Sequence, residues 1–290
     1  MKQLSLDTLR TEIDAIDDKI HHLLMSRTEL VTEIGNMKQR AGDHVFSLRP
    51  AREASMMRRL AAQHKGPFPA SALIKIWREL LSGQVRVQTP FSVAVCDGDD
   101  PVSYRGLVRD QFSGAPVKSF SRPEEATASV DSGASAVAVV PLPVRNSAES
   151  WWTELAFGKH QNLQIIGLLP FLQTTASDPI EAFSIAAVHP EPSGKDVSLA
   201  VLECNREAFD YNLINAQPSC RLLSQLSQNN NGKIEKTKKT MILVSIEGFL
   251  DQPGDVFSLL PPSLQTIVTR IAIIGCYPKQ LSLSDIAGTL

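Results

Sequence analysis

Three cations near the start of the chain could surround one small anion. Arg27 and Lys38 are eleven residues apart, and on a helix that spacing brings two side chains within about 20° of the same face and roughly 16 Å apart along the axis. Arg10 lies roughly 25 Å from Arg27 on the same helix, so it could reach that anion only from a second, antiparallel chain. The alternative is that all three are solvated surface cations.

One long helix has to carry these cations. Residues 6–39 contain no proline and a single glycine, and their apolar residues follow the i, i+3, i+4 spacing of an amphipathic helix. Such a helix would be roughly 50 Å long, which is more than a small domain can cover. Two shorter helices are expected over 51–64 and 70–87. This combination predicts an intertwined dimer rather than a monomer.

Composition limits the possible partners and locations. The chain has 290 residues, a hydrophobic fraction of 43% and a net charge of −2, which predict a globular protein of two or three domains that does not bind nucleic acid. The sequence has neither an apolar signal segment nor a run of transmembrane length, so we expect no membrane partner and a cytoplasmic location. Its four cysteines are widely spaced, which predicts buried free thiols and no metal site.

The pattern of the chain changes after residue 89. Strands are expected at 92–96, 117–120, 136–140, 163–169, 182–188, 197–203, 221–226, 241–246 and 270–275. Up to residue 190 they alternate with helices as in βαβ units on a parallel sheet, and from residue 191 their order is that of a ferredoxin-like βαββαβ module. The predicted fold is therefore multi-domain, with an all-α three-helix domain over 1–89, a small α/β lobe over 90–190 and a βαββαβ domain over 191–290.

Spaced motifs in the first segment resemble those of a known enzyme family. They are Leu9-Arg10, Ile13-Asp14-x-Ile16-Asp17, Leu23-Leu24-x-x-Arg27-x-x-Leu30, Ile34-Gly35-x-x-Lys38, Arg52-Glu53 and Gln88. Together they resemble the all-helical class of chorismate mutases, which is also found at the head of bifunctional chorismate mutase–prephenate dehydratases. The resemblance implies a homodimer in which the first helix spans both subunits and its first arginine enters the partner's active site.

The resemblance also implies the reaction and the role of each position. Chorismate, the expected substrate, rearranges to prephenate in one concerted step that needs no metal and no cofactor, so the site has to supply only shape and charge. Lys38 and Gln88 would donate to the ether oxygen, and Glu53 would accept from the ring hydroxyl. Three arginines would hold the substrate carboxylates: Arg27, Arg52 and the partner subunit's Arg10.

Two positions depart from that family's pattern. Arg49 stands where an acidic residue commonly assists with the hydroxyl, and the loop before it is two residues longer than in the best-known members. Gln84 stands where a small hydroxyl residue often touches a carboxylate. We expect both to bind substrate and to alter its affinity without loss of the chemistry, because the donors to the ether oxygen are kept.

The later segments resemble a dehydratase and its regulatory domain. The VPLPVRNS run at 140–147 is similar to a motif of prephenate dehydratases. However, Glu181-Ala182-Phe183 aligns with their Thr-Arg-Phe catalytic motif and a second lobe is missing, so no dehydratase activity is expected. Ile246-Glu247-Gly248-Phe249 and Ile274-Gly275-Cys276-Tyr277-Pro278 resemble motifs of the ACT domain. That domain's glycine-rich turn and ESRP motif are not found, which leaves an amino-acid effector open.

These patterns favour a chorismate mutase of phenylalanine and tyrosine synthesis with a degenerate dehydratase–ACT tail. An isochorismate-pyruvate lyase is an alternative, because it uses the same fold and the same cations, although the dehydratase-like tail argues against it. A third possibility is a non-catalytic module that docks onto, or regulates, another enzyme of aromatic biosynthesis.

Overall fold

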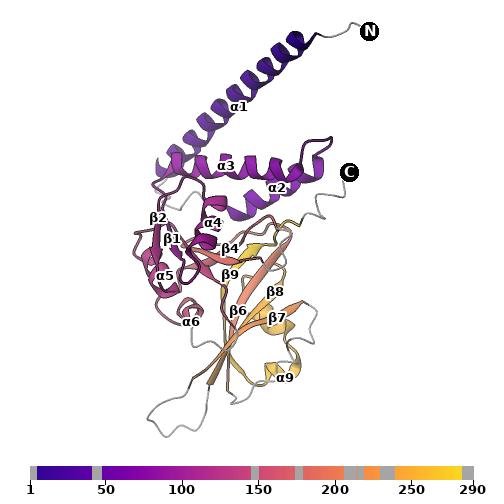
Figure 1. Cartoon of the computed structure of the whole chain (residues 1–290). Helices are drawn as coiled ribbons and strands as arrows, with labels where there is room; N and C mark the ends of the chain where they lie inside the picture. The colour runs from indigo at the N-terminus through magenta and orange to yellow at the C-terminus, as the bar shows by residue number, and fades with distance from the viewer. Residues whose placement is uncertain are drawn as a thin grey trace.

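The N-terminal part of the molecule consists of helices. The computed structural model describes residues 5–40, 48–144, 150–173, 179–205, 214, 219–228 and 239–282. The first three helices are α1 (Leu6–Arg40), α2 (Pro50–Gln63) and α3 (Ala70–Gln88). In Figure 1, α1 projects away from the rest of the molecule and meets α3 near the C-terminal ends of both helices. The predicted N-terminal helical segment is confirmed.

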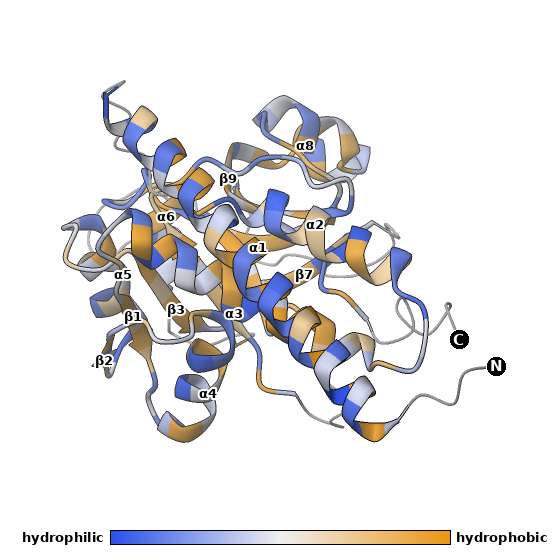
Figure 2. Cartoon of the chain, turned by 90° about the horizontal axis from the view of Figure 1, so that it is seen from above, coloured by the Kyte–Doolittle hydropathy of each residue, from blue (hydrophilic) through white to orange (hydrophobic). Residues whose placement is uncertain are grey.

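The apolar face of α1 is exposed along most of its length. Ile16 is 53% exposed and Leu23 is 66% exposed. Figure 2 shows hydrophobic and hydrophilic residues along the whole of this helix. Side chains of this type are usually buried, and a continuous apolar stripe marks an interaction surface. A single chain thus leaves uncovered the face that the sequence predicts to be buried.

A nine-stranded mixed sheet forms the second part of the molecule. Its strands are β1 (Val93–Cys96), β2 (Val117–Phe120), β3 (Val137–Pro141), β4 (Gln164–Leu169), β5 (Ala182–Ala186), β6 (Asp196–Cys204), β7 (Cys220–Gln228), β8 (Lys239–Glu247) and β9 (Val268–Pro278). The helices around it are α4 (Pro101–Gln111), α5 (Pro123–Asp131), α6 (Trp151–Ala156), α8 (Pro253–Leu259) and α9 (Pro262–Gln265). The strand order is β2-β1-β3-β5-β4-β9-β6-β8-β7.

The expectation of a parallel sheet holds for only part of the first half. β1 pairs in parallel with β2 and β3, as expected where helices form the crossovers. β5 instead pairs antiparallel with β3 and with β4. No described helix joins β4 to β5, and successive strands that lack a helical crossover pair antiparallel.

The sheet also crosses the predicted boundary between residues 190 and 191. β4 pairs in parallel with β9, and Ile165 lies opposite Gly275. The four strands of the C-terminal half have the order β9-β6-β8-β7 and pair antiparallel, as expected for a βαββαβ module. The first helix expected of such a module would fall in residues 206–218, of which only Ile214 is described. The two predicted units are therefore joined in one large sheet.

Helices α2 and α3 share a hydrophobic cluster with the sheet region. Its buried members are Ala54, Met57, Ala61, Ile74, Phe171 and Leu281. Phe171 follows β4 and Leu281 follows β9, so residues from distant parts of the chain complete the core of the helix pair. The predicted all-α domain therefore packs on the sheet region through a common core.

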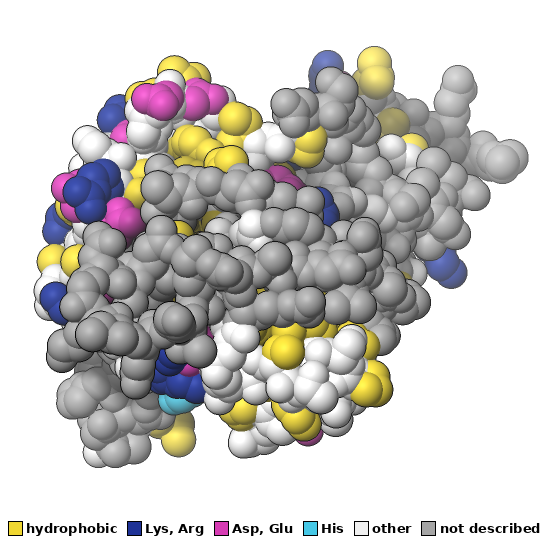
Figure 3. Space-filling view, turned by 90° about the horizontal axis from the view of Figure 1, so that it is seen from below, with side chains coloured by type: hydrophobic (Ala, Val, Ile, Leu, Met, Phe, Trp, Pro, Cys, Tyr) yellow, Lys and Arg dark blue, Asp and Glu magenta, His cyan; other side chains and the backbone are white. Residues whose placement is uncertain are grey.

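On the face seen in Figure 3, the Lys and Arg side chains that are described occur in small separate groups. Among the described helices, none is both long enough and apolar enough to cross a bilayer.

The contact between β4 and β9 depends on a glycine. A Cβ added at Gly275 would clash with the backbone oxygen and nitrogen of Ile165. We therefore expect Gly275→Ala to lower the free energy of unfolding by about 1–3 kcal/mol through overpacking, measured by urea denaturation. The matched control is Gly254→Ala in α8, where an added Cβ meets nothing within 4 Å. That variant should be unchanged or more stable, by up to about 1 kcal/mol. Equal stabilities of the two variants would contradict the assigned contact.

Candidate active site

The candidate site lies where α1 meets α3. The side-chain amide of Gln88 donates a hydrogen bond to the carbonyl oxygen of Val31 at 2.9 Å. The helices approach so closely here that a Cβ added at Gly35 would lie 3.5 Å from Cγ of Gln88. Because residues three or four apart share a helix face, Arg27, Val31, Gly35 and Lys38 form one stripe along α1. This stripe faces the last turns of α3.

Arg27 lies in this stripe and forms no ion pair with a described residue. Its side chain is half-buried, and its Nη1 atom is buried with no hydrogen-bond partner among the described residues. Burial, and secondly the positive charge of Arg52, lower the pKa of the Arg27 guanidinium. Arg52, which is exposed on α2, therefore lies close enough to Arg27 for mutual repulsion. Two neighbouring guanidinium groups with a buried unpaired N–H form a site for an anion.

Gln84 adds a second buried donor. It lies one turn before Gln88 on α3, is 7% exposed, and its Nε2 atom is buried without a partner in the described structure. Leaving a buried N–H donor unpaired is unfavourable, so a ligand that brings acceptor oxygens would stabilise this arrangement. Lys38 is half-buried at the C-terminal end of α1 and forms no ion pair with a described residue. Arg27, Lys38 and Gln84 thus bring cations and an amide donor to the site, and no described carboxylate pairs with either cation.

One predicted residue lies far from this site within the same chain. Arg10 is near the free end of α1, where its side chain is 73% exposed and contacts Asp7 at 3.3 Å. The rise of the helix separates it from Arg27 by roughly 25 Å. A single chain therefore does not bring Arg10 together with Arg27 and Lys38.

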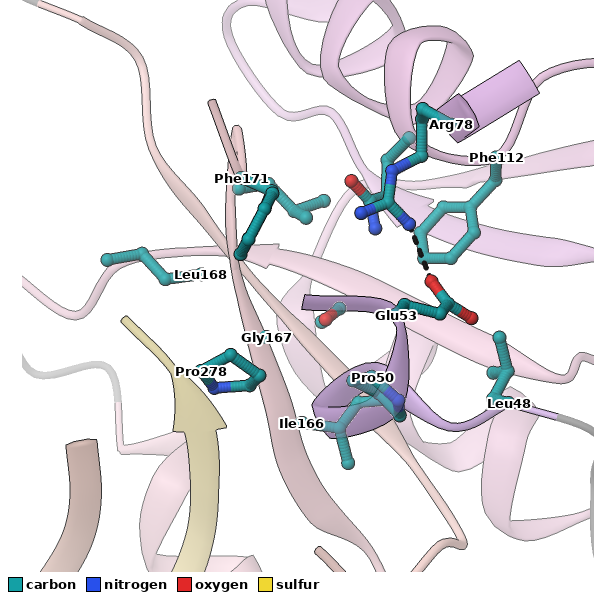
Figure 4. Close-up of a pocket in the computed structure, with 13 residues that line it drawn as sticks. Leu48, Pro50, Glu53, Arg78, Phe112, Ile166, Gly167, Leu168, Phe171 and Pro278 are labelled. Carbon is teal, nitrogen blue, oxygen red and sulfur yellow. Dashed lines mark hydrogen bonds and ion pairs between the residues drawn. The ribbon is translucent and has the colours of Figure 1, made fainter. Parts of the chain in front are cut away.

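Two more predicted residues, Arg49 and Glu53, pair with residues of the sheet region and of α3. Arg49 forms hydrogen bonds with both carboxylate oxygens of Glu191, at 2.9 Å from Nη2 to each. Glu53, one turn later on α2, forms an ion pair with Arg78 of α3 at 2.6 Å. Figure 4 shows this pair in a crevice between the helices and the sheet. Arg49 and Glu53 thus share a face of α2 that differs from the one on which Arg52 approaches Arg27.

Arg78 is a residue that the sequence analysis missed. It interrupts the apolar series of α3 between Ile74 and Leu81, which are four residues before it and three after it. A cation at such a position indicates a buried carboxylate partner. The partner itself could not be identified, because Glu53 is on another helix.

The described residues hold no cluster of His, Cys, Asp and Glu suited to a metal ion. Cys96, Cys204 and Cys276 are buried free thiols, as predicted. Burial raises the pKa of Cys204 to about 12 and that of Cys276 to about 11. Neither of these two thiols is therefore a ready nucleophile at neutral pH.

Comparison with known proteins finds a family match for the helical segment. Residues 9–89 match the family model of chorismate mutase type II. The bifunctional chorismate mutase/prephenate dehydratase of Stutzerimonas stutzeri is 28% identical over 148 residues, which are 50% of this chain and 40% of that protein. The protein of the same name from Aquifex aeolicus is 34% identical over 93 residues, 31% of this chain and 25% of that one.

The matched part covers well under two thirds of those relatives. The alignment of 148 residues is longer than the helical segment, so it includes part of the sheet region. Among solved structures, a prephenate dehydratase from Streptococcus mutans has a TM-score of 0.38 at 15% identity, covering 66% of this chain and all of that one. GqqA, a quorum quenching acylase, has a TM-score of 0.44 at 17% identity, covering 65% and 95%. These scores are too low to carry an argument. The predicted resemblance to the chorismate mutases is confirmed by the family match.

Burial of an unpaired N–H donor on Arg27 should lower the free energy of unfolding, and this effect can be measured. Arg27→Met removes a buried N–H without an acceptor and the repulsion by Arg52, so we expect the free energy of unfolding of the ligand-free protein to rise by about 1 kcal/mol. Thermal unfolding at a fixed protein concentration would measure this. The control, Arg40→Met, changes an exposed cation on the same helix and should stay within about 0.5 kcal/mol of the wild type. A less stable Arg27→Met variant would mean that Arg27 has a structural partner.

Proposed function

From the membership of residues 9–89 in the chorismate mutase type II family, we propose that this chain isomerises chorismate to prephenate. The proposal rests mainly on one observation: two buried donors, on Arg27 and Gln84, have no acceptor among the described residues. The substrate carries two carboxylates, which would supply those acceptors. The wider activity of the bifunctional relatives is not implied, because this chain matches 40% of their length or less.

The proposed mechanism uses charge and shape only. As the bond between the ring and the ether oxygen breaks, negative charge develops on that oxygen. Donors aimed at it stabilise the transition state more than the ground state. We assign Lys38 and Gln88 to this role. The amide of Gln88 gives one hydrogen to Val31 and keeps a second for the substrate. Since an amide does not titrate, this donor would function across neutral pH.

We propose that carboxylate binding rests on Arg27, Arg52 and the partner subunit's Arg10. The first two already lie close together, and burial of Arg27 strengthens its interaction with an anion. Gln84 would donate to the same carboxylates from α3. The partner subunit's Arg10 would complete the site, because within one chain Arg10 is at the opposite end of α1.

This arrangement requires the homodimer that we propose. The exposed apolar stripe of α1 extends from Leu9 to Met37, and a second copy of the helix could cover it. At about 25 cal/mol per Å², covering so many large apolar side chains is strongly favourable. Formation of the dimer would then bury the stripe and also place the partner subunit's Arg10 at the site.

The sheet region is proposed to act as a scaffold without dehydratase chemistry. Phe183, which aligns with the last residue of the dehydratase motif, is buried against Trp151 and Tyr277. Arg145 of the VPLPVRNS run lies outside the described residues. The antiparallel order of β9-β6-β8-β7 supports an ACT-type fold, but the sequence lacks the motifs that bind an amino acid there. We therefore propose that this part has kept its fold and lost its effector site.

The decisive experiment is turnover of chorismate by the purified chain. We expect prephenate as the end product, and Lys38→Ala should lower kcat by about 100- to 1,000-fold because it removes one donor to the developing charge. Lys19→Ala, which changes another cation of α1, should keep wild-type rates. Phenylpyruvate as a product would contradict the loss of dehydratase activity. Absence of chorismate turnover, or release of pyruvate from isochorismate, would overturn the proposed reaction.

Dimerisation can be tested on α1 itself. Ile16→Lys places a charge in the apolar stripe and should shift the particle from two chains of 31.7 kDa to one, as measured by analytical ultracentrifugation. Asp18→Lys introduces the same residue about 200° around the helix and should leave the dimer intact. A monomeric wild type at micromolar concentration would refute the proposed assembly.

A further inference from the structure

The crevice beneath α2 and α3 contains a nearly buried ion pair. The carboxylate of Glu53 and the guanidinium of Arg78 are 2.6 Å apart, and their side chains are only 13% and 11% exposed. Arg78 also lies over the ring of Phe171, 5.7 Å from its centroid, and its Nη2 atom contacts the sulfur of Met57 at 3.5 Å. Figure 4 shows Glu53, Arg78 and Phe171 around the same space. Breaking such a pair leaves an uncompensated buried charge.

Phe171 belongs to the sheet region and is fixed there. It follows β4, is 9% exposed, and its carbonyl oxygen accepts a hydrogen bond from the backbone of Leu281 at 2.7 Å. The backbone of Gln173 in turn donates to Leu281 at 2.9 Å. Hydrogen bonds therefore join the backbone after β4 to the backbone after β9, and they fix the position of the Phe171 ring that contacts Arg78.

Other side chains of α2 attach this helix to the sheet region. Arg49, at its start, pairs with Glu191. Arg58, further along, donates to the backbone oxygens of Lys195 at 2.9 Å and Lys279 at 2.7 Å. Together with Glu53, they attach α2 to α3 and the sheet region at several points along the helix. Arg52 is adjacent to Glu53, so these attachments decide the rotation at which Arg52 approaches Arg27.

We propose that Arg78 and Phe171 are positioning residues for the anion-binding arginines of the mutase site. Through Glu53 they set the rotation of α2, and the rotation of α2 places Arg52 beside Arg27. This inference rests on the proposed function and deepens it, since it makes the sheet region a working part of that site. It also gives Glu53 a different role from the one implied by family resemblance. Its carboxylate, whose Oε2 atom accepts from Arg78, would position α2 rather than accept from the ring hydroxyl of the substrate.

Steady-state kinetics with two substrates test this proposal. The variants are Arg78→Met, Arg78→Lys, Phe171→Leu and Glu53→Gln, and the substrates are chorismate and an analogue that lacks the ring hydroxyl. Arg78→Met should lower kcat/KM by about tenfold, chiefly through KM, because displaced arginines weaken carboxylate binding in ground and transition state alike. Arg78→Lys keeps the charge and should recover most of the loss. Glu53→Gln should be impaired by the same factor with both substrates.

The control is Lys239→Met, which removes a comparable ion pair with Glu203 at 3.1 Å in the C-terminal half of the sheet. Its kcat and KM should equal those of the wild type. If Arg78→Met does not fold, Phe171→Leu carries the test, because it keeps an apolar side chain at this position and removes the ring. Its KM should rise severalfold.

Three results would overturn the proposal. Folded Arg78→Met or Phe171→Leu protein with wild-type KM would remove the positioning role. A Glu53→Gln defect seen with chorismate and absent with the analogue would show that Glu53 accepts a hydrogen bond from the ring hydroxyl. A wild type that does not turn over chorismate would overturn the proposed function and this inference with it, whereas the first two results would leave the proposed function standing.

Discussion

An α-helix of 35 residues is about 50 Å long, and no other described element is long enough to cover it. The two helices that follow are 14 and 19 residues long, and α3 meets α1 near its C-terminal end, where Gln88 reaches Val31. A helix in water draws most of its stability from packing of its apolar face. The uncovered stripe therefore links the fold of this segment to the homodimer that we propose, and Arg10 lies in the part that a single chain leaves free.

The C-terminal end of α1 is distinguished by positive charges and by donors without partners among the described residues. Arg27 and Arg52 repel each other, and buried donors on Arg27 and Gln84 lack acceptors. On the neighbouring helices, Arg49 pairs with Glu191 and Arg78 pairs with Glu53. A buried guanidinium N–H without a partner beside a second guanidinium is typical of functional sites, where local rules of stability are broken in favour of binding.

The sheet region supports the helices. Phe171 and Leu281 complete the hydrophobic cluster of α2 and α3, and Glu191 and the backbone near Lys195 hold α2 from the other side. Removal of this region would expose that cluster and unpair the cations of α2. The sheet region therefore has a structural role for the helices within this one chain.

Local sequence patterns were sufficient for the elements and for the family. The 3.6-residue period predicted α1, and the spacing from Arg10 to Gln88 predicted the chorismate mutase segment, because both depend on neighbours along the chain. The patterns also placed the strands, since β-branched runs are local as well. Some of the residues that the resemblance points to lie near one another in the structure: Arg27 is close to Arg52, and Gln88 reaches α1. Their roles stay a prediction.

Other features were decided by the tertiary structure alone. The pairing of Arg49 with Glu191 spans 142 residues of sequence, and the contact of β4 with β9 joins two halves that the sequence presents as separate units. The ion pair of Glu53 with Arg78 likewise joins residues of two different helices, so it depends on how those helices pack. Periodicity reports which face of an element is buried but not what buries it, because a contact between distant segments depends on how the whole chain packs.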